Sequence, residues 1–245
     1  MSEQGKTSKG GRFETTRWTW VCAAQGAEEP SRASALEELC RTYWYPLYAY
    51  VRRRGKSAAE AEDLTQEFFR RLLEKDYLKA ADQDKGKFRT FLLVAMKRFL
   101  ANEWHRARAQ KRGGEYAFVP IDTGWAEEMY HHEPVDRVTP ESLYERRWAL
   151  LMLERALGAV REDMERSGKG PLFESLKDAL TGNPTEQSYA EVAEEFGLSE
   201  GAVKATVHRL RGRFRKHLRE IIADTVRDDE DVEDEIQHLF SVFSA

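Results

Sequence analysis

The chain has 245 residues, 33% of them charged, and a formal net charge of −4. This length accommodates one large or two small domains. No apolar run approaches the roughly 20 residues that a membrane-spanning helix needs, and residues 1–18 lack the apolar core of a secretory signal. These features predict a cytoplasmic protein without a membrane segment.

The sequence carries no recognisable catalytic or metal-binding motif. Its two cysteines, Cys22 and Cys40, have no paired spacing, which argues against a disulfide framework or a Cys-type zinc site. His131, His132 and Glu133 are adjacent but lack the spacing of metal ligands. There is no Gly-rich phosphate loop, nucleophile elbow or pair of catalytic carboxylates. We therefore predict a protein that is not an enzyme and that has no catalytic residues, metal or cofactor.

Nearly all of the remaining pattern is helical, and we predict an all-α fold. Residues 1–34 form an N-terminal extension, whose Gly-, Ser- and Lys-rich start indicates disorder. Residues 35–54 are predicted to form a helix that Pro46 bends or splits. Residues 57–75 follow as a helix opened by a Ser-x-x-Glu capping box. A third long helix, residues 88–112, is apolar at first and basic at its end.

A break in the helical pattern divides the chain into two small helical domains. Residues 113–140 contain three glycines and three prolines, and we interpret them as a flexible linker. Residues 35–112 then form the first domain and residues 141–223 the second. Residues 224–245 form a C-terminal extension that is first acidic and then apolar.

The second domain contains a helix-turn-helix pattern in residues 188–219. A capping box opens its first helix, Gly197 stands where the turn requires a positive φ, and Ser199 is placed to cap the second helix. The second helix repeats apolar residues at steps of three and four, which predicts one buried face. Between Lys204 and Arg219 it carries seven cations and no acid, which favours entry into DNA.

Positive charge is concentrated in two separate helices. Residues 97–112 contain Glu103 as their only acid, and the helix after Gly197 is the second basic segment. The acids are densest in residues 228–235. Two basic helices on one chain predict two contacts with DNA.

Three stretches of the chain resemble conserved regions of one protein family. SAAEAEDLTQEFFRRLL, residues 57–73, resembles the second conserved region of bacterial sigma factors, and FRTFLLVAMKRFLANEWHRARAQKR, residues 88–112, resembles the following helix, which melts and reads the promoter −10 element. SYAEVAEEFGLSEGAVKATVHRLRGRFRKHL, residues 188–218, resembles the fourth-region helix-turn-helix, which reads the −35 element. The chain thus resembles the sigma-70 family and, with only two sigma domains visible, its extracytoplasmic-function (ECF) subfamily.

This resemblance implies partners and site residues. The partners are core RNA polymerase (the clamp of its largest subunit and the flap of its second subunit) and promoter DNA, both double-stranded and melted. An anti-sigma factor or a Ser/Thr kinase is a further candidate partner. The resemblance assigns polymerase binding to Asp63, Gln66, Glu67 and Arg70, the −10 contact to Lys87, Lys97, Arg98, Asn102, His105, Arg106 and Arg108, and the −35 contact to Gly201, Lys204, Ala205, His208, Arg209, Arg211 and Arg213. Cations suit phosphates, while the first turns of the recognition helix suit base edges.

Two hypotheses concern regulation. In the first, the apolar face of residues 228–245 docks on the body of the protein and the acids compete with DNA for the basic helix; the alternative is a solvated helical extension. In the second, Thr65 is a phosphosite, because phosphate beside Asp63 and Glu67 would change the charge of the docking helix. The alternative is that Thr65 is an ordinary helix residue.

The predicted function is that of a sigma factor directing promoter-specific initiation, and three other functions stay open. A dimeric helix-turn-helix regulator would need a dimer surface and a palindromic site, but not the helix of residues 57–73. A nucleic-acid-processing enzyme should show a carboxylate or metal cluster. A protein that titrates polymerase would bind the core without using promoters.

Overall fold

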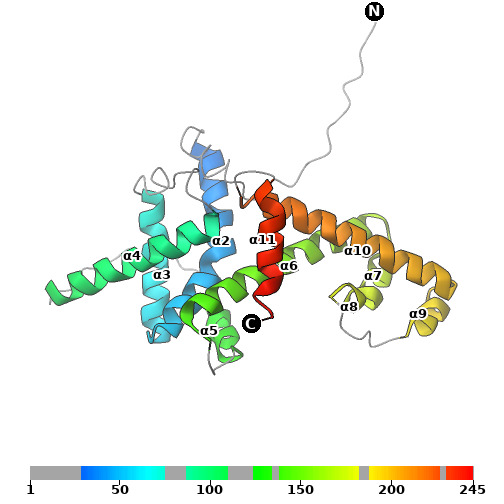
Figure 1. Ribbon diagram of the computed structural model, residues 1–245, viewed down its shortest axis with the longest axis horizontal. Helices are drawn as coiled ribbons and strands as arrows, with labels where there is room; N and C mark the ends of the chain where they lie inside the picture. The colour runs from blue at the N-terminus through cyan, green and yellow to red at the C-terminus, as the bar shows by residue number, and fades with distance from the viewer. Residues whose placement is uncertain are drawn as a thin grey trace, which may run out of the picture.

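Every regular element that the structure describes is an α-helix, which confirms the all-α prediction. The structure is a computed structural model (Figure 1), and it describes residues 29–74, 87–109, 124–133, 138–181, 188–226 and 230–244. The predicted disorder of residues 1–12 lies outside these ranges. The helices are α2 (Glu29–Arg53), α3 (Ala58–Glu74), α4 (Phe88–Ala109), α5 (Gly124–His131), α6 (Pro140–Arg166), α7 (Gly170–Leu176), α8 (Asp178–Thr181), α9 (Tyr189–Glu195), α10 (Glu200–Ala223) and α11 (Glu230–Ser241).

The first helices follow the sequence pattern closely. Pro46 lies inside α2, which continues as one helix, so the predicted split does not occur. The capping box before α3 is formed: the Glu60 amide donates to Ser57 Oγ at 3.3 Å, and the Ser57 amide donates to Glu60 Oε2 at 3.0 Å. The apolar stripe of α3 packs inward, with Phe68 and Leu72 buried. These local signals set where α3 begins and which face it buries.

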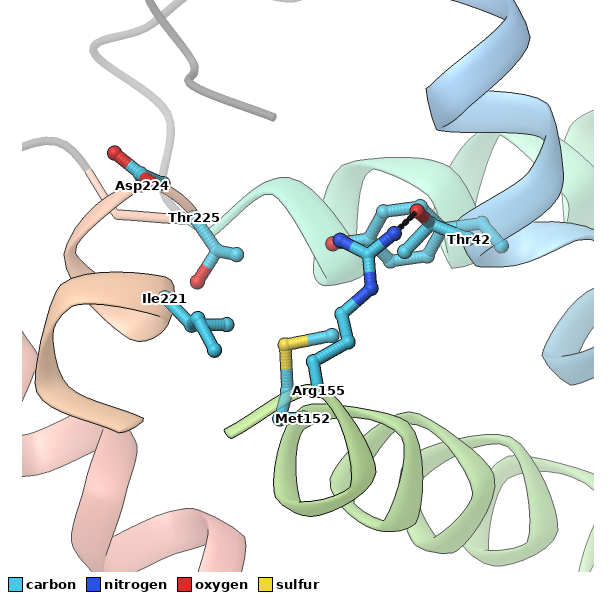
Figure 2. Close-up of a pocket in the computed structure, with 7 residues that line it drawn as sticks. Thr42, Met152, Arg155, Ile221, Asp224 and Thr225 are labelled. Atoms are coloured by element: carbon cyan, nitrogen blue, oxygen red, sulfur yellow. Dashed lines mark hydrogen bonds between the residues drawn. The ribbon is translucent and has the colours of Figure 1, made fainter. Parts of the chain in front are cut away.

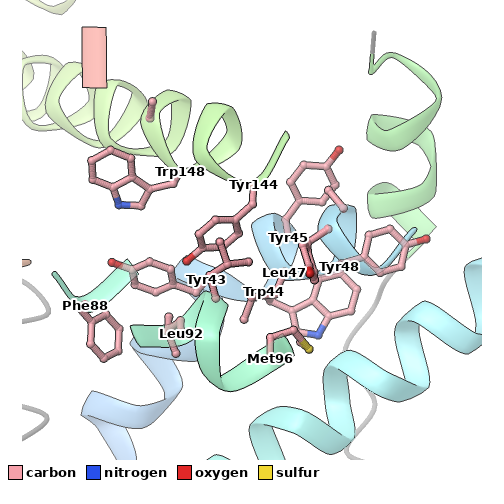
Figure 3. Packing of buried hydrophobic residues seen from close by; sticks show 14 of the residues in the cluster. Tyr43, Trp44, Tyr45, Leu47, Tyr48, Phe88, Leu92, Met96, Tyr144 and Trp148 are labelled. Atoms are coloured by element: carbon pink, nitrogen blue, oxygen red, sulfur yellow. The ribbon is translucent and has the colours of Figure 1, made fainter. Parts of the chain in front are cut away.

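The long helix α6 belongs to two hydrophobic cores. Its first half packs against α2 and α4, where Tyr144 and Trp148 are fully buried beside an aromatic run of α2 (Figure 3). Its second half contributes Val160 and Met164 to a smaller core shared with α7, α8, α9 and the first half of α10. The predicted second domain therefore gives the start of α6 and the end of α10 to the core of the first.

Part of the predicted linker is helical and packs on α2. Glu127 of α5 accepts hydrogen bonds from Arg52, at 2.9 Å from Nε and 2.5 Å from Nη2, and from the Tyr48 hydroxyl. The Tyr45 hydroxyl donates to buried Glu133 at 2.9 Å, and Arg147 of α6 forms an ion pair with the same carboxylate. Residues 124–133 are thus held between α2 and α6, while residues 113–123 and 134–137 of the linker lie outside the described ranges.

A small cavity lies where α2, α6 and the end of α10 meet (Figure 2). Its volume of about 10 Å³ holds at most about one water molecule. Arg155 of α6 crosses it to donate a hydrogen bond to Thr42. The lining residues are Thr42, Tyr43, Met152, Arg155, Ile221, Asp224 and Thr225.

Within the part of the chain that the structure describes, none of the helices has the length and hydropathy that crossing a bilayer requires. Within the same residues, no cluster of three or more His, Cys, Asp or Glu side chains has the geometry of a metal site.

Candidate nucleic-acid and polymerase interface

The predicted helix-turn-helix is formed by α9, the turn at residues 196–199, and α10. The Glu191 amide donates to Ser188 Oγ at 3.3 Å and the Ser188 amide to Glu191 Oε2 at 2.7 Å, so the capping box closes. Gly197 adopts φ +64°, in the left-handed region that favours glycine. Ser199 Oγ then accepts the Ala202 amide at 3.2 Å and starts α10. The sequence prediction for this turn is confirmed at each position.

One face of α10 is buried and the opposite face is exposed. Val203, Val207 and Leu210 pack in the smaller core. The other side presents five of the predicted −35 residues to solvent: Gly201, Lys204, Ala205, His208 and Arg209. They recur at three- and four-residue steps and so line one side of the helix. Small residues beside cations let such a face approach a duplex closely and meet both base edges and phosphates.

Two other predicted −35 residues hold the domain together. Arg211 donates to the Ala179 carbonyl of α8, at 3.1 Å from Nε and 2.7 Å from Nη2. Arg213 Nη1 lies 3.6 Å from Sδ of Met164 on α6. Sequence periodicity missed these roles because both positions are exposed on α10 and their partners lie on other helices.

The predicted −10 surface runs along α4. Arg98 and Asn102 are exposed, and Trp104 is 56% exposed, as base stacking requires. Lys97 is also exposed, and its Nζ lies 2.8 Å from Oε1 of Glu141 on α6. The side chains of three further predicted residues lie outside the described ones: His105, Arg106 and Arg108.

Lys87, the first predicted −10 residue, is not on an open surface. Its Nζ lies 2.6 Å from Oε2 of Glu235 on α11, and the Glu235 side chain is fully buried. Glu235 also accepts hydrogen bonds from Arg89, at 2.5 Å from Nε. Burial by itself raises the pKa of Glu235, but the ion pairs with Arg89 and Lys87 outweigh it and lower that pKa below its ordinary value. The available sequence signal was an acid on the apolar face formed by Val232 and Leu239.

The predicted polymerase-binding residues lie on α3 and differ in their surroundings. Asp63 is exposed, whereas Gln66, Glu67 and Arg70 are half-buried. Glu67 accepts from Arg70 at 2.6 Å and from Arg71 at 2.5 Å, and these hydrogen bonds lower its pKa despite partial burial. Arg71 also donates a hydrogen bond from Nη1 to Oε1 of Glu103 on α4, at 2.6 Å. Glu67 therefore belongs to a network that joins α3 to α4, in which sequence analysis had not included Arg71 or Glu103.

Thr65 is buried on the inner side of α3. It is fully inaccessible to solvent, and its Oγ1 donates to the Ala61 carbonyl at 2.7 Å. A kinase would reach this hydroxyl only if α3 opened. The structure therefore counts against the proposed phosphosite and favours the interpretation of Thr65 as an ordinary helix residue.

Comparison with known proteins identifies the first part of the chain. Residues 39–110 match the family model described as Sigma-70 region 2. This range runs from the middle of α2 through α3 and α4, the helices that carry the predicted polymerase and −10 residues. No curated protein and no solved structure matches the chain. Residues 39–110 therefore form a sigma-70 region 2 domain, which implies the function of a sigma factor in transcription initiation with core RNA polymerase rather than that of an enzyme.

Proposed function

We propose that the protein is a cytoplasmic, nucleoid-associated sigma factor of the ECF type. It binds core polymerase through α3, melts and reads the −10 element through α4, and reads the −35 element through α10. The observation that carries this proposal is that one chain has two exposed helix faces suited to DNA. The face on α4 lies inside the region 2 match, and the basic face on α10 lies outside it. Capture of bases from the opened strand drives unwinding, without nucleotide hydrolysis.

Each surface has a distinct chemical role in this proposal. Exposed Asp63 meets the clamp of the largest polymerase subunit, while the second domain meets the flap of the second subunit. On α4, Arg98 binds phosphates, Asn102 bonds an unpaired base and Trp104 stacks on one. On α10, the exposed face that includes Arg209 enters the major groove. An anti-sigma factor as a further partner is supported by the family resemblance alone.

The test is initiation in a purified system. Core polymerase, fragmented genomic DNA from the source organism and nucleotides are incubated with and without the protein, and RNA 5′ ends are sequenced. We expect protein-dependent starts that share a −10 and a −35 element at constant spacing. Core polymerase alone is the control. Co-purification with the core but no new starts would favour a protein that titrates polymerase. A palindromic binding site without core binding would favour a dimeric regulator.

A further inference from the structure

The C-terminal helix α11 lies across α6, between the region 2 helices and the helix-turn-helix (Figure 1). Val232 and Leu239 of α11 are buried in the larger core, and Ile236 packs partly buried against it. The predicted docking of the apolar face on the body of the protein is thereby confirmed. The docked face also carries a buried acid, Glu235.

This acid, Glu235, lies against the start of α4. Its carboxylate lies 2.5 Å from Arg89 Nε and 2.6 Å from Lys87 Nζ. Replacing a buried ion pair by well-packed apolar residues is often neutral or stabilising, so the docking of α11 does not by itself require an acid at this position. The docking of α11 is therefore tied to the electrostatic state of two cations at the start of the proposed −10 helix.

A second acid of α11 reaches the other DNA-binding helix. Glu233 forms an ion pair with Arg219, near the end of α10, and both side chains are at least half exposed. Such a pair is screened by water and salt and contributes little to stability. The ends of the two helices also meet directly, since the Phe88 amide donates to the Thr225 carbonyl at 3.3 Å. Helix α11 thus contacts the junction between the start of α4 and the end of α10.

We propose that α11 is an autoinhibitory element that competes with DNA phosphates for Lys87 and Arg219. A carboxylate and a phosphate both accept charge-assisted hydrogen bonds from the same donors, so each cation binds either α11 or DNA. In the docked state α11 withholds these cations; when α11 leaves, they add to the DNA-binding surfaces and the start of α4 is uncovered. The inference rests on the proposed DNA contacts of α4 and α10 and adds their regulation.

The experiment compares Glu235→Gln with Asp234→Asn in the full chain. Asp234 is the exposed neighbour on the same helix, so both variants lose one negative charge but only Glu235→Gln weakens the buried contact. Binding to a fluorescent 30-nucleotide duplex of mixed sequence is measured by anisotropy at several salt concentrations. We expect Glu235→Gln to bind about fivefold more tightly than Asp234→Asn and the salt slope to steepen by about 0.9 for each cation released. Equal affinity of two folded variants would overturn the proposal.

Two further measurements assign the effect to Lys87 and protect against a folding defect. In a Lys87→Gln background the gain from Glu235→Gln should shrink to less than half. In the wild-type protein, hydrogen exchange of the α11 amides should accelerate when the duplex is added, and this result decides the question if Glu235→Gln does not fold. If the duplex binds and the α11 amides stay equally protected, the autoinhibitory role is wrong but the proposed DNA contacts stand. If neither the wild type nor any folded variant binds DNA, the proposed DNA contacts fail as well.

Discussion

Arg89 and Glu235 stand 146 positions apart in the sequence, yet their side chains form a buried ion pair with 2.5 Å between Nε and Oε1. Arg89 also pairs with Glu145 of α6 and lies over the Trp148 ring, 4.8 Å from its centroid. This single guanidinium therefore joins α4, α6 and α11. It connects the sigma-70 region 2 domain to the C-terminal extension.

Removing one partner of this pair should destabilise the protein strongly. Arg89→Met leaves the Glu235 carboxylate buried beside Lys87 alone, and we expect a loss of about 3–5 kcal/mol in the free energy of unfolding. The double variant Arg89→Met, Glu235→Leu should lose clearly less, because no buried charge is left unpaired. Urea unfolding measures both, with exposed Arg98→Met as the control, expected within about 0.5 kcal/mol of wild type. Equal losses in the single and double variants would contradict this account.

The same carboxylate predicts a pH dependence of stability. The pKa of Glu235 lies below its ordinary value of 4.5 in the folded protein, so the folded state binds this proton less readily than the unfolded state. Its stabilising contribution is present above the unfolded pKa and disappears as the pH falls through the folded pKa. Urea midpoints measured from about pH 6 down to about pH 3 should fall more in the wild type than in Glu235→Gln. Parallel curves would show that Glu235 makes no such contribution.

Two glycines on either side of the recognition surface should respond oppositely to alanine. Gly197 has φ +64°, and an alanine there costs about 1–2 kcal/mol through its backbone conformation alone. Gly212 lies inside α10 with open space around its Cβ position, and alanine there should stabilise by up to about 1 kcal/mol. Thermal unfolding of both variants provides the comparison, and a stabilised Gly197→Ala would show that the turn tolerates a side chain.

Arg209 and Arg211 separate DNA binding from domain stability. Arg209 lies on the exposed face of α10, where its Nη2 donates to Thr206 of the same helix at 2.9 Å. Arg209→Ala should weaken binding to a −35 duplex by about 1–3 kcal/mol and leave the melting temperature nearly unchanged. Arg211→Ala should lower the melting temperature because the Ala179 carbonyl loses both hydrogen bonds. The reverse pattern in these two assays would exchange the roles of the residues.

On α3, substitution of Asp63 should affect polymerase binding, whereas substitution of Glu67 should affect the stability of the fold. Asp63→Asn removes an exposed charge, and we expect weaker binding to purified core polymerase with unchanged stability. Glu67→Gln disrupts the network that runs through Arg71 to Glu103 and should lower stability by about 1–3 kcal/mol. Pull-down with the core and thermal unfolding give the two readouts. Unaltered core binding by Asp63→Asn would remove it from the interface.

Local sequence signals were enough to predict the recognition turn and most of the helices, although not α5, which lies in the predicted linker. The capping boxes at Ser57 and Ser188 and the glycine at position 197 act within a few residues, so their effect on the backbone depends little on the rest of the protein. Apolar periodicity likewise predicted which face of α10 is buried, because the 3.6-residue period relates spacing directly to direction. The family resemblance of residues 57–112 rests on the same contiguous stretches, and most of this range lies inside the family match at residues 39–110.

The tertiary structure decided how the helices share their side chains. The family resemblance assigns Lys87 and Arg211 to DNA contacts, but their partners Glu235 and Ala179 come from other helices. Likewise, the sequence pattern predicts two domains joined by a linker. In the structure α6 joins both cores, because one half of it packs on α2 and the other on α10. Such contacts depend on packing between segments far apart in the chain, where the free energy of burying a surface has no local sequence signature.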